Sequence, residues 1–177
     1  MSQKGSSPSR RSIRLPGYDY SQAGAYFVTI VTYDRKPLFG EVKNDEMHLN
    51  ALGKIAQDEW FRTSRLRLYV KLLEDEFIVM PNHIHGIIWI TDTVGAYRNT
   101  PLPTQSFHSP GIGIGAIIRG YKSSVTSINQ LRQTPATPIW QRNYYEHIIR
   151  NEQEMQSIAD YTITNPLNWE KDAENQD

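Results

Sequence analysis

The strongest constraint on the fold is the run Ala25–Tyr33, which is almost continuously apolar and rich in aromatic and β-branched residues. Only Thr29 and Thr32 interrupt it with polar side chains. Such a run is typical of a β-strand that is covered on both sides. We therefore expect a central strand of a sheet here, ended by the turn-forming segment 34–37.

Shorter signals on both sides of this run predict the remaining elements. Residues 41–50 favour a hairpin or short edge strand around Asn44-Asp45, and Asn50 resembles the N-cap of a helix that runs to about Arg67. Apolar segments predict strands over 69–73, 77–80 and 83–91. Helical spacing predicts helices over about 116–131 and, between Asn151 and the stop at Asn165-Pro166, over 152–164.

The resulting order is strand, strand, helix, strand, strand, a long loop, and two or three helices. This order predicts an α+β fold in which an antiparallel sheet is packed with helices. We expect one domain over residues 18–169, with a long proline-rich loop at about 92–111. A disordered basic tail over 1–17 and an acidic tail over 170–177 are expected to flank it.

Composition excludes several classes of protein. The chain has 177 residues, 38% of them hydrophobic, which suits one globular core. It has no cysteine, so disulfides, zinc–thiolate sites and cysteine nucleophiles are excluded. No apolar run is long enough to span a membrane, and residues 1–14 lack the apolar core of a secretory signal, so we expect a cytoplasmic protein.

The net charge is zero, but basic residues are concentrated in two segments. They lie in the tail 1–14 and in 112–150, where only Glu146 opposes them. Each segment is either an ordinary solvated surface or a site for DNA phosphates. Basic grooves with aromatic side chains bind single strands. The DNA-binding candidates are therefore Arg10, Arg11, Arg14, Arg119, Lys122, Trp140, Arg142 and Tyr144.

His83 and His85 lie one residue apart at the start of a predicted strand. Side chains two apart on a strand point the same way, so both imidazoles should share one face while Ile84 points into the core. Two such imidazoles form half of a divalent-metal site. The same pair is also compatible with two ordinary histidines that bind no metal.

Tyr161 and Asn165 share one face of the predicted last helix, because they are four residues apart. A tyrosine hydroxyl needs activation to act as a nucleophile. Together with His83 and His85, the amide oxygen of Asn165 could complete a site for Mg²⁺ or Mn²⁺ beside a substrate phosphate. The alternative for Tyr161 is a tyrosine that serves packing alone.

Three blocks of the sequence, in order, resemble the signatures of the single-tyrosine HUH transposases (the IS200-like family), and most of all their REP-associated members. The blocks are Met80-Pro81-Asn82-His83-Ile84-His85-Gly86, then residues 140–151, then residues 160–166. The resemblance extends from about Tyr26 to Asn168. It implies an RRM-like or ferredoxin-like antiparallel sheet with the histidines on a central strand and the tyrosine on a C-terminal helix.

The resemblance also implies a chemistry. Tyr161 would attack a DNA phosphate, form a 5′-phosphotyrosine and release a 3′-hydroxyl. His83 and His85 would bind the metal, with Asn165 in the position of the third ligand, where insertion-sequence relatives have glutamine. The implied substrate is single-stranded DNA with hairpins, as in REP palindromes, and the implied process is DNA transposition by an endonuclease and strand transferase. Family members act as monomers or homodimers, and no zipper-like seam favours a dimer here.

Other functions stay open at this point. A rolling-circle replication initiator or relaxase would use the same superfamily chemistry. An RRM-like nucleic-acid-binding module would have no chemistry, and a metal hydrolase would use the histidines alone. Tyr144 and Tyr145 are alternative nucleophiles, although core packing or DNA contact suits their position better.

Overall fold

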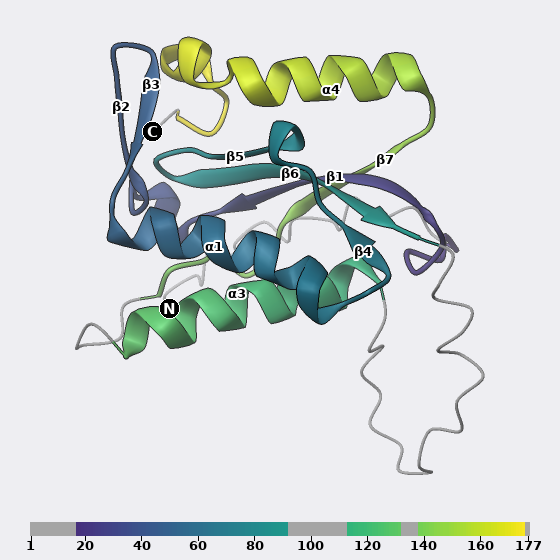
Figure 1. The fold of residues 1–177 in the computed structure, drawn as a ribbon. Coiled ribbons are helices and arrows are strands. Elements are labelled where there is room, and N and C mark those ends of the chain that lie inside the picture. The colour runs from purple at the N-terminus through teal and green to yellow at the C-terminus, as the bar shows by residue number, and fades with distance from the viewer. Residues whose placement is uncertain (1–16, 92–112, 132–137, 176–177) are drawn as a thin grey trace, which may run out of the picture.

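A computed structural model describes residues 17–91, 113–131 and 138–175 (Figure 1). Its centre is an antiparallel sheet in the order β4-β6-β1-β7, with β5 pairing with β6 beyond the end of β4. The strands are β1 (Gly24–Val31), β4 (Val70–Lys71), β5 (Phe77–Val79), β6 (His83–Ile90) and β7 (Tyr145–Ile149). The sheet is covered by helices, as the α+β prediction required.

The apolar run that opened the sequence analysis forms β1, the central strand. It pairs with β6 along its whole length, from Gly24 opposite Ile90 to Val31 opposite His83. Its other edge pairs with β7. Its last seven residues are buried, which explains why the sequence lacks the polar alternation of an edge strand.

β7 is the element that the sequence analysis did not predict. Only helices were expected after the long loop, but Tyr145–Ile149 is extended and pairs with β1 from Thr29 to Ala25. The segment is short, and Glu146 and His147 interrupt its apolar character. It therefore carries neither a clean alternation nor a long apolar run, and its pairing with β1 stabilises it instead.

Two helices cover one face of the sheet and a third covers the other (Figure 1). Helices α1 (Ala51–Leu66) and α3 (Ile114–Gln130) pack against each other and against the large core, which includes Tyr26, Val28 and Ile84. Helix α4 (Glu152–Thr164) lies over a much smaller apolar cluster. That cluster is Ala25, Phe27 and Ile87, contacted by Trp89, Ile149, Met155 and Ile158.

The predicted helix ends are confirmed by their caps. The side chain of Asn50 accepts hydrogen bonds from the backbone N–H groups of Leu52 and Gly53, and that of Asn151 accepts one from Glu154. Helix α4 ends at Thr164, and the chain continues after Asn165 as the short 3₁₀ helix η3 (Pro166–Lys171).

The smaller elements complete the fold. The hairpin of β2 (Gly40–Lys43) and β3 (Glu46–Leu49) turns at Asn44 and Asp45, both in the left-handed conformation that a tight hairpin requires. Two more 3₁₀ helices are η1 (Tyr33–Arg35) and η2 (Glu74–Glu76). Within the described ranges, no helix combines the length and the apolar character needed to cross a membrane. The predicted loop 92–111 and most of the tail 1–17 lie outside the described residues.

Candidate functional site

His83 and His85 lie side by side on the face of β6 that α4 covers. Their ring centroids are 4.4 Å apart, whereas Ile84 between them is fully buried in the core on the opposite face. The two-residue period of the strand therefore has the expected effect. The same alternation places Phe27 of β1 on the histidine face, where its ring stacks against that of His85.

The hydrogen bonds around His83 determine which ring nitrogen carries its proton. Asn82 donates through Nδ2 to the carbonyl oxygen of Glu174, so its Oδ1 is the acceptor that lies 2.8 Å from Nδ1 of His83. Nδ1 of His83 therefore carries the proton, and Nε2 is left with a free lone pair. Nε2 is buried and has no hydrogen-bond partner among the described residues.

His85 is held in a similar way. Its Nδ1 lies 2.9 Å from Oγ1 of Thr29 on the neighbouring strand, and its Nε2 lies 3.4 Å from the hydroxyl of Tyr161. Burial lowers the pKa of His83 to about 4, and burial next to His83 lowers the pKa of His85 well below its ordinary value. Both imidazoles are therefore neutral near pH 7, the form that binds metal ions.

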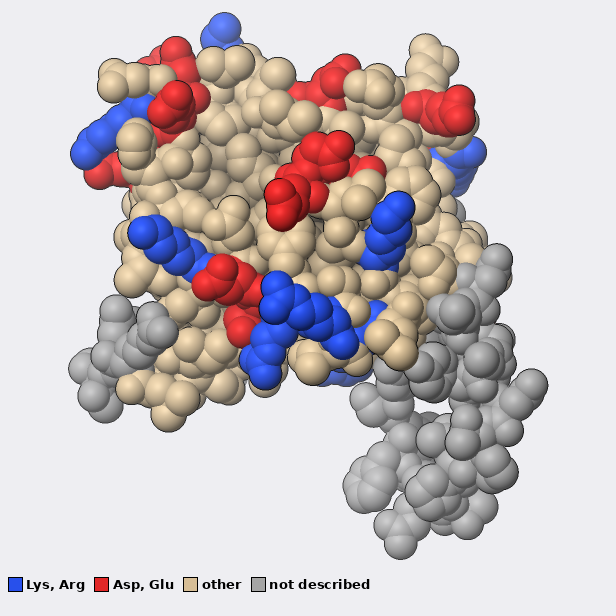
Figure 2. Space-filling view, viewed as in Figure 1, with Lys and Arg blue, Asp and Glu red and all other residues tan. Residues whose placement is uncertain are grey.

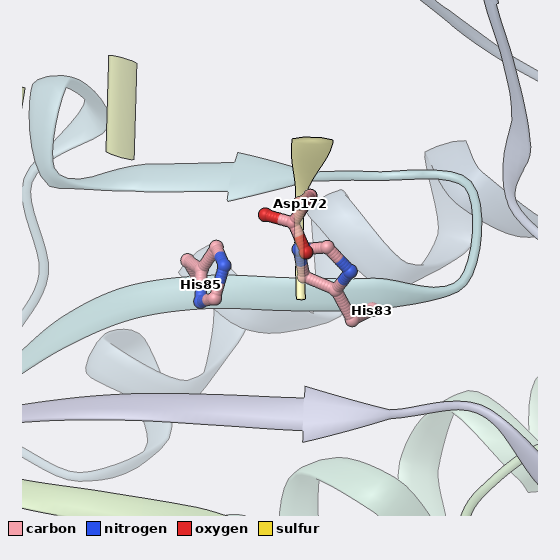
Figure 3. Close-up of side chains that lie close together, drawn as sticks. All are labelled: His83, His85 and Asp172. Atoms are coloured by element: carbon pink, nitrogen blue, oxygen red, sulfur yellow. The ribbon is translucent and has the colours of Figure 1, made fainter. Parts of the chain in front are cut away.

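Asp172 joins the two histidines, although the sequence analysis included it in the acidic tail (Figure 3). A ligand atom from each of the three residues lies within 4.8 Å of the others. Asp172 is only 6% exposed. Its Oδ1 accepts a hydrogen bond from the backbone N–H of Glu174, and its Oδ2 accepts hydrogen bonds from Tyr161 and Asn165. It is the site residue that sequence reasoning missed.

No local pattern marks Asp172. It follows Glu170 and Lys171 in a polar segment, and it reaches the histidines only because η3 carries the chain back over β6. The one apolar signal nearby is Trp169, whose ring centroid lies 6.0 Å from that of His83. A large aromatic residue in an otherwise polar terminus can indicate that the segment packs on the domain.

Tyr161 projects from α4 toward this cluster. Its hydroxyl donates a hydrogen bond of 3.1 Å to Oδ2 of Asp172, and its side chain is 44% exposed. Burial of the hydroxyl and the negative charge of Asp172 raise the pKa of Tyr161 to about 12. As the structure stands, the phenol is in reach of the cluster and of solvent, but it is strongly held in its protonated form.

Asn165, the predicted third metal ligand, lies beside the cluster and is almost fully buried. Its Nδ2 donates a hydrogen bond of 2.8 Å to Oδ2 of Asp172. Its Oδ1 has no partner among the residues that the structure describes. Tyr161 and Asn165, which were predicted to share one helix face, both donate to Oδ2 of Asp172, and Asp172 lies beside the histidines.

The donor set fits a divalent cation. Two neutral imidazoles, one carboxylate and one amide oxygen suit a borderline or hard ion such as Mn²⁺ or Mg²⁺. The orphaned Nε2 of His83 gives the clearest indication, because a buried nitrogen without a partner costs free energy that a bound ion would offset.

The predicted DNA-binding residues are not brought to this cluster. Arg10, Arg11 and Arg14 lie outside the described residues. Lys122 and Trp140 belong to the opposite layer: Nζ of Lys122 donates to the carbonyl oxygens of Gln141 and Asn143, and Trp140 packs on Phe39 and Tyr121. Burial lowers the pKa of Lys122 to about 8. Its ammonium therefore anchors the segment before β7 rather than standing free.

Of the remaining candidates, Tyr144 packs against the large core below Lys122, whereas Arg119 and Arg142 are exposed. Figure 2 shows acidic and basic side chains dispersed over the face it presents, with one group of blue side chains in its lower part and others along its upper edge and sides. The exposed basic residues on α1 and α3 include Arg62, Arg65 and Arg119. The helix layer opposite α4 therefore exposes basic side chains, as other parts of the surface do.

Comparison with known proteins identifies two relatives by sequence, while no protein-family model matches. An uncharacterized protein of Haemophilus influenzae is 41% identical over 167 residues, which are 92% of this chain and 91% of that protein. A second protein of the same organism, named "Putative REP-associated tyrosine transposase", is 25% identical over 152 residues, which are 84% of this chain and 73% of that protein.

Comparison of structures agrees at the level of the fold. The solved structure of a REP-associated tyrosine transposase bound to a REP hairpin superposes with a TM-score of 0.56 at 20% identity, over 89% of this chain and 74% of that one. The expected antiparallel sheet packed with helices is therefore the fold of this transposase. The chain is therefore similar in sequence to a protein named as a REP-associated tyrosine transposase, and it shares the fold of a solved one.

Proposed function

We propose that this protein is a metal-dependent endonuclease and strand transferase for single-stranded DNA with hairpins, and that Tyr161 is its nucleophile. The observation that carries the proposal is the position of the Tyr161 hydroxyl, 3.4 Å from Nε2 of His85 and 3.1 Å from Oδ2 of Asp172. A helix tyrosine that served packing alone would have no reason to place its hydroxyl against a buried cluster of potential metal ligands.

His83 and His85 would bind the ion through their Nε2 atoms, with the carboxylate of Asp172 as third ligand. We favour Asp172 because its negative charge partly neutralises a divalent ion between two uncharged imidazoles. Asn165 would orient Asp172 through the hydrogen bond from Nδ2, or would take the third position itself through Oδ1, as the sequence analysis predicted. A bound ion would polarise the scissile phosphate and stabilise the negative charge of the transition state.

The covalent step is an exchange of esters at phosphorus. The phenolic oxygen of Tyr161 attacks the phosphorus, the bond from phosphorus to the 3′-oxygen breaks, and that oxygen leaves as a 3′-hydroxyl after taking a proton from water, to which Asp172 then returns the proton of the phenol. The proton of the phenol passes to Asp172, which already accepts its hydrogen bond. A 3′-hydroxyl of another strand then attacks the 5′-phosphotyrosine, reforms a phosphodiester and returns the phenol, so no external energy source is required.

A denaturing gel tests this proposal directly. The full chain is incubated with Mn²⁺ or Mg²⁺ and a hairpin-containing single strand from the DNA that flanks its gene, labelled at the 3′ end. The label has to be at this end because a 5′-phosphotyrosine retains the 3′ fragment. We expect a labelled protein–DNA adduct for the wild type, none for Tyr161→Phe, and wild-type yield for the control Tyr145→Phe, whose ring is exposed on β7.

Two outcomes would contradict the proposal. An adduct that persists in Tyr161→Phe would show that another residue is the nucleophile. If no adduct forms with authentic hairpins in the presence of either metal, the proposed strand-transfer activity is rejected. The third ligand is tested separately by titrating Mn²⁺ into Asp172→Asn and Asn165→Ala: the variant that loses more affinity identifies the ligand, and we expect that variant to be Asp172→Asn.

A further inference from the structure

A cavity of about 400 Å³ is lined by residues from the start of α1 and the end of α3. These two helix ends lie next to each other in the helix layer (Figure 1). The volume of the cavity is in the lower part of the range of small-molecule pockets, about 300–1,000 Å³. Leu38, Leu52 and Ile139 provide apolar walls, and Tyr33 and Lys36 line it as well. The side chain of Tyr33 is 49% exposed, which is unusual for a large aromatic residue beside a cavity.

Asn129 supplies the polar group of this cavity. It is 9% exposed, and its side-chain amide has no hydrogen-bond partner within the described ranges. The other asparagine of the wall, Asn50, is different: its Oδ1 caps α1 and its Nδ2 donates to the carbonyl oxygen of Leu38. The amide atoms of Asn129 are not fully buried, so solvent or a ligand in the cavity can reach and hydrogen-bond them.

The walls are held in place by hydrogen bonds. The backbone N–H of Tyr33 donates to the carbonyl oxygen of Ile139, and Oγ1 of Thr32 donates to that of Lys36. The turn between them uses left-handed conformations at Asp34 and Arg35 (φ of 57° and 50°), which side chains other than glycine adopt at a cost. The position of Tyr33 and Lys36 at the cavity is therefore fixed by the fold.

The cavity and the proposed catalytic site are connected through the residues at the end of β1. Thr32, next to Tyr33, donates from its backbone N–H to the carbonyl oxygen of Asn82, the residue before His83. Val31 pairs directly with His83, so Tyr33 lies roughly 7 Å further along the chain at ~3.3 Å per residue. A nucleotide close to the scissile phosphate could therefore reach the cavity around the end of the sheet.

On the basis of the proposed function, we propose that this cavity binds an unpaired nucleobase of the single-stranded DNA substrate. The ring of Tyr33 and the apolar walls would contact the faces of the base. The amide of Asn129, which both donates and accepts, would read its edge. Lys36 would contact the neighbouring phosphate, because its one described ion pair, with Asp34 at 3.9 Å, joins two exposed side chains and is weak.

The test measures binding by fluorescence anisotropy, with full-length protein in EDTA so that no cleavage occurs. The probes are short labelled oligodeoxynucleotides that carry each base in turn, or an abasic residue, at one central position. We expect the wild type to prefer one base over the abasic probe by about tenfold. In Asn129→Leu the affinities for the preferred and the abasic probe should differ by no more than about twofold. Tyr33→Ala should lower the affinity for the preferred probe by about tenfold.

Matched controls separate the cavity from general effects. Asn143→Leu and Leu68→Ala remove an exposed amide and an exposed apolar side chain outside the cavity and should bind as the wild type does. Thermal unfolding establishes that each variant is folded. Free deoxynucleoside monophosphates, added as competitors, distinguish a site for a base within a strand, which they displace weakly, from a site for free nucleotides, which they displace completely.

Equal binding of all probes by the wild type would overturn the proposal, as would an unchanged preference in Asn129→Leu or complete displacement by free nucleotides. The covalent-adduct assay on the same preparations keeps the two proposals apart. A base preference that depends on Asn129, without any adduct, would support the cavity and reject the strand transferase. An adduct that depends on Tyr161, without any base preference, would reject the cavity alone.

Discussion

Acidifying the metal-free protein tests whether the imidazole of His83 is neutral in the folded state. Burial lowers its pKa from an ordinary value of 6.5 to about 4. The unfolded chain therefore binds a proton at this residue between these two values and the folded chain does not. The neutral His83 therefore leaves the free energy of unfolding undiminished above pH 6.5. As the pH falls toward 4, that free energy decreases, because the unfolded chain binds the proton and the folded chain does not.

The size of the effect follows from the two pKa values. At pH 5 the difference in proton binding lowers the free energy of unfolding by about 2 kcal/mol for His83 alone. For a chain of this length that corresponds to a fall in Tm of about 4–8 °C. His85 contributes in the same direction, since its pKa is also lowered by burial. The measurement is urea unfolding at pH 7 and pH 5 in EDTA.

The informative comparison is the loss between the two pH values within each variant. In His83→Gln, which cannot titrate, the loss should be smaller than in the wild type by about 2 kcal/mol. His48→Gln, which replaces an exposed histidine on β3, should show the wild-type loss. If His83→Gln and the wild type lose the same stability on acidification, His83 is not held neutral by burial and the reasoning about its free Nε2 fails.

Two further predictions concern the metal and the packing. Mn²⁺ at about a hundred times its Kd should raise the free energy of unfolding of the wild type by about 2.7 kcal/mol, and EDTA should reverse the effect. Mn²⁺ should not stabilise His83→Gln. Equal shifts of the two proteins in calorimetric scans would contradict the proposed ligands. Gly86→Ala should destabilise the fold by about 1–3 kcal/mol, because its Cβ would lie 2.5 Å from the ring of Trp60, which is itself stacked on Phe77. The control Gly120→Ala should leave the free energy of unfolding unchanged or raise it by up to about 1 kcal/mol, because its Cβ would meet only the flexible end of Arg67. Both variants are measured by urea unfolding. Equal losses of free energy in the two variants would reject the packing argument.

The elements that the sequence predicted are those with local causes. β1 was recognisable because burial on both sides requires an apolar residue at nearly every position. The starts of α1 and α4 were recognisable because Asn50 and Asn151 satisfy backbone N–H groups within their own first turns. The positions of the two histidines follow from the period of a single strand.

The features that the sequence did not predict have distant causes. β7 is a strand because β1 offers it a free edge, and nothing within residues 145–149 requires that pairing. Asp172 joins the site through contacts with residues that are distant in the sequence, namely His83 and His85. Conversely, Lys122 and Trp140 were DNA-binding candidates because they lie in a basic segment with aromatic residues, and the sheet separates them from the histidines.

The asymmetry of the two layers explains why chemistry could be placed under α4. The layer of α1 and α3 buries the large core, which includes Trp60, Tyr121 and the inward side chains of β1 and β6. Helix α4 has Thr162 as its one buried residue and contacts a small apolar cluster through Met155 and Ile158. The stability of the fold therefore depends mainly on the opposite face, and the free energy needed to detach α4 is only a fraction of that of global unfolding. Buried polar groups such as Nε2 of His83 are tolerated on a face whose packing contributes little. The proposed nucleophile, Tyr161, is carried by the least tightly packed helix, which would ease its approach to a phosphate.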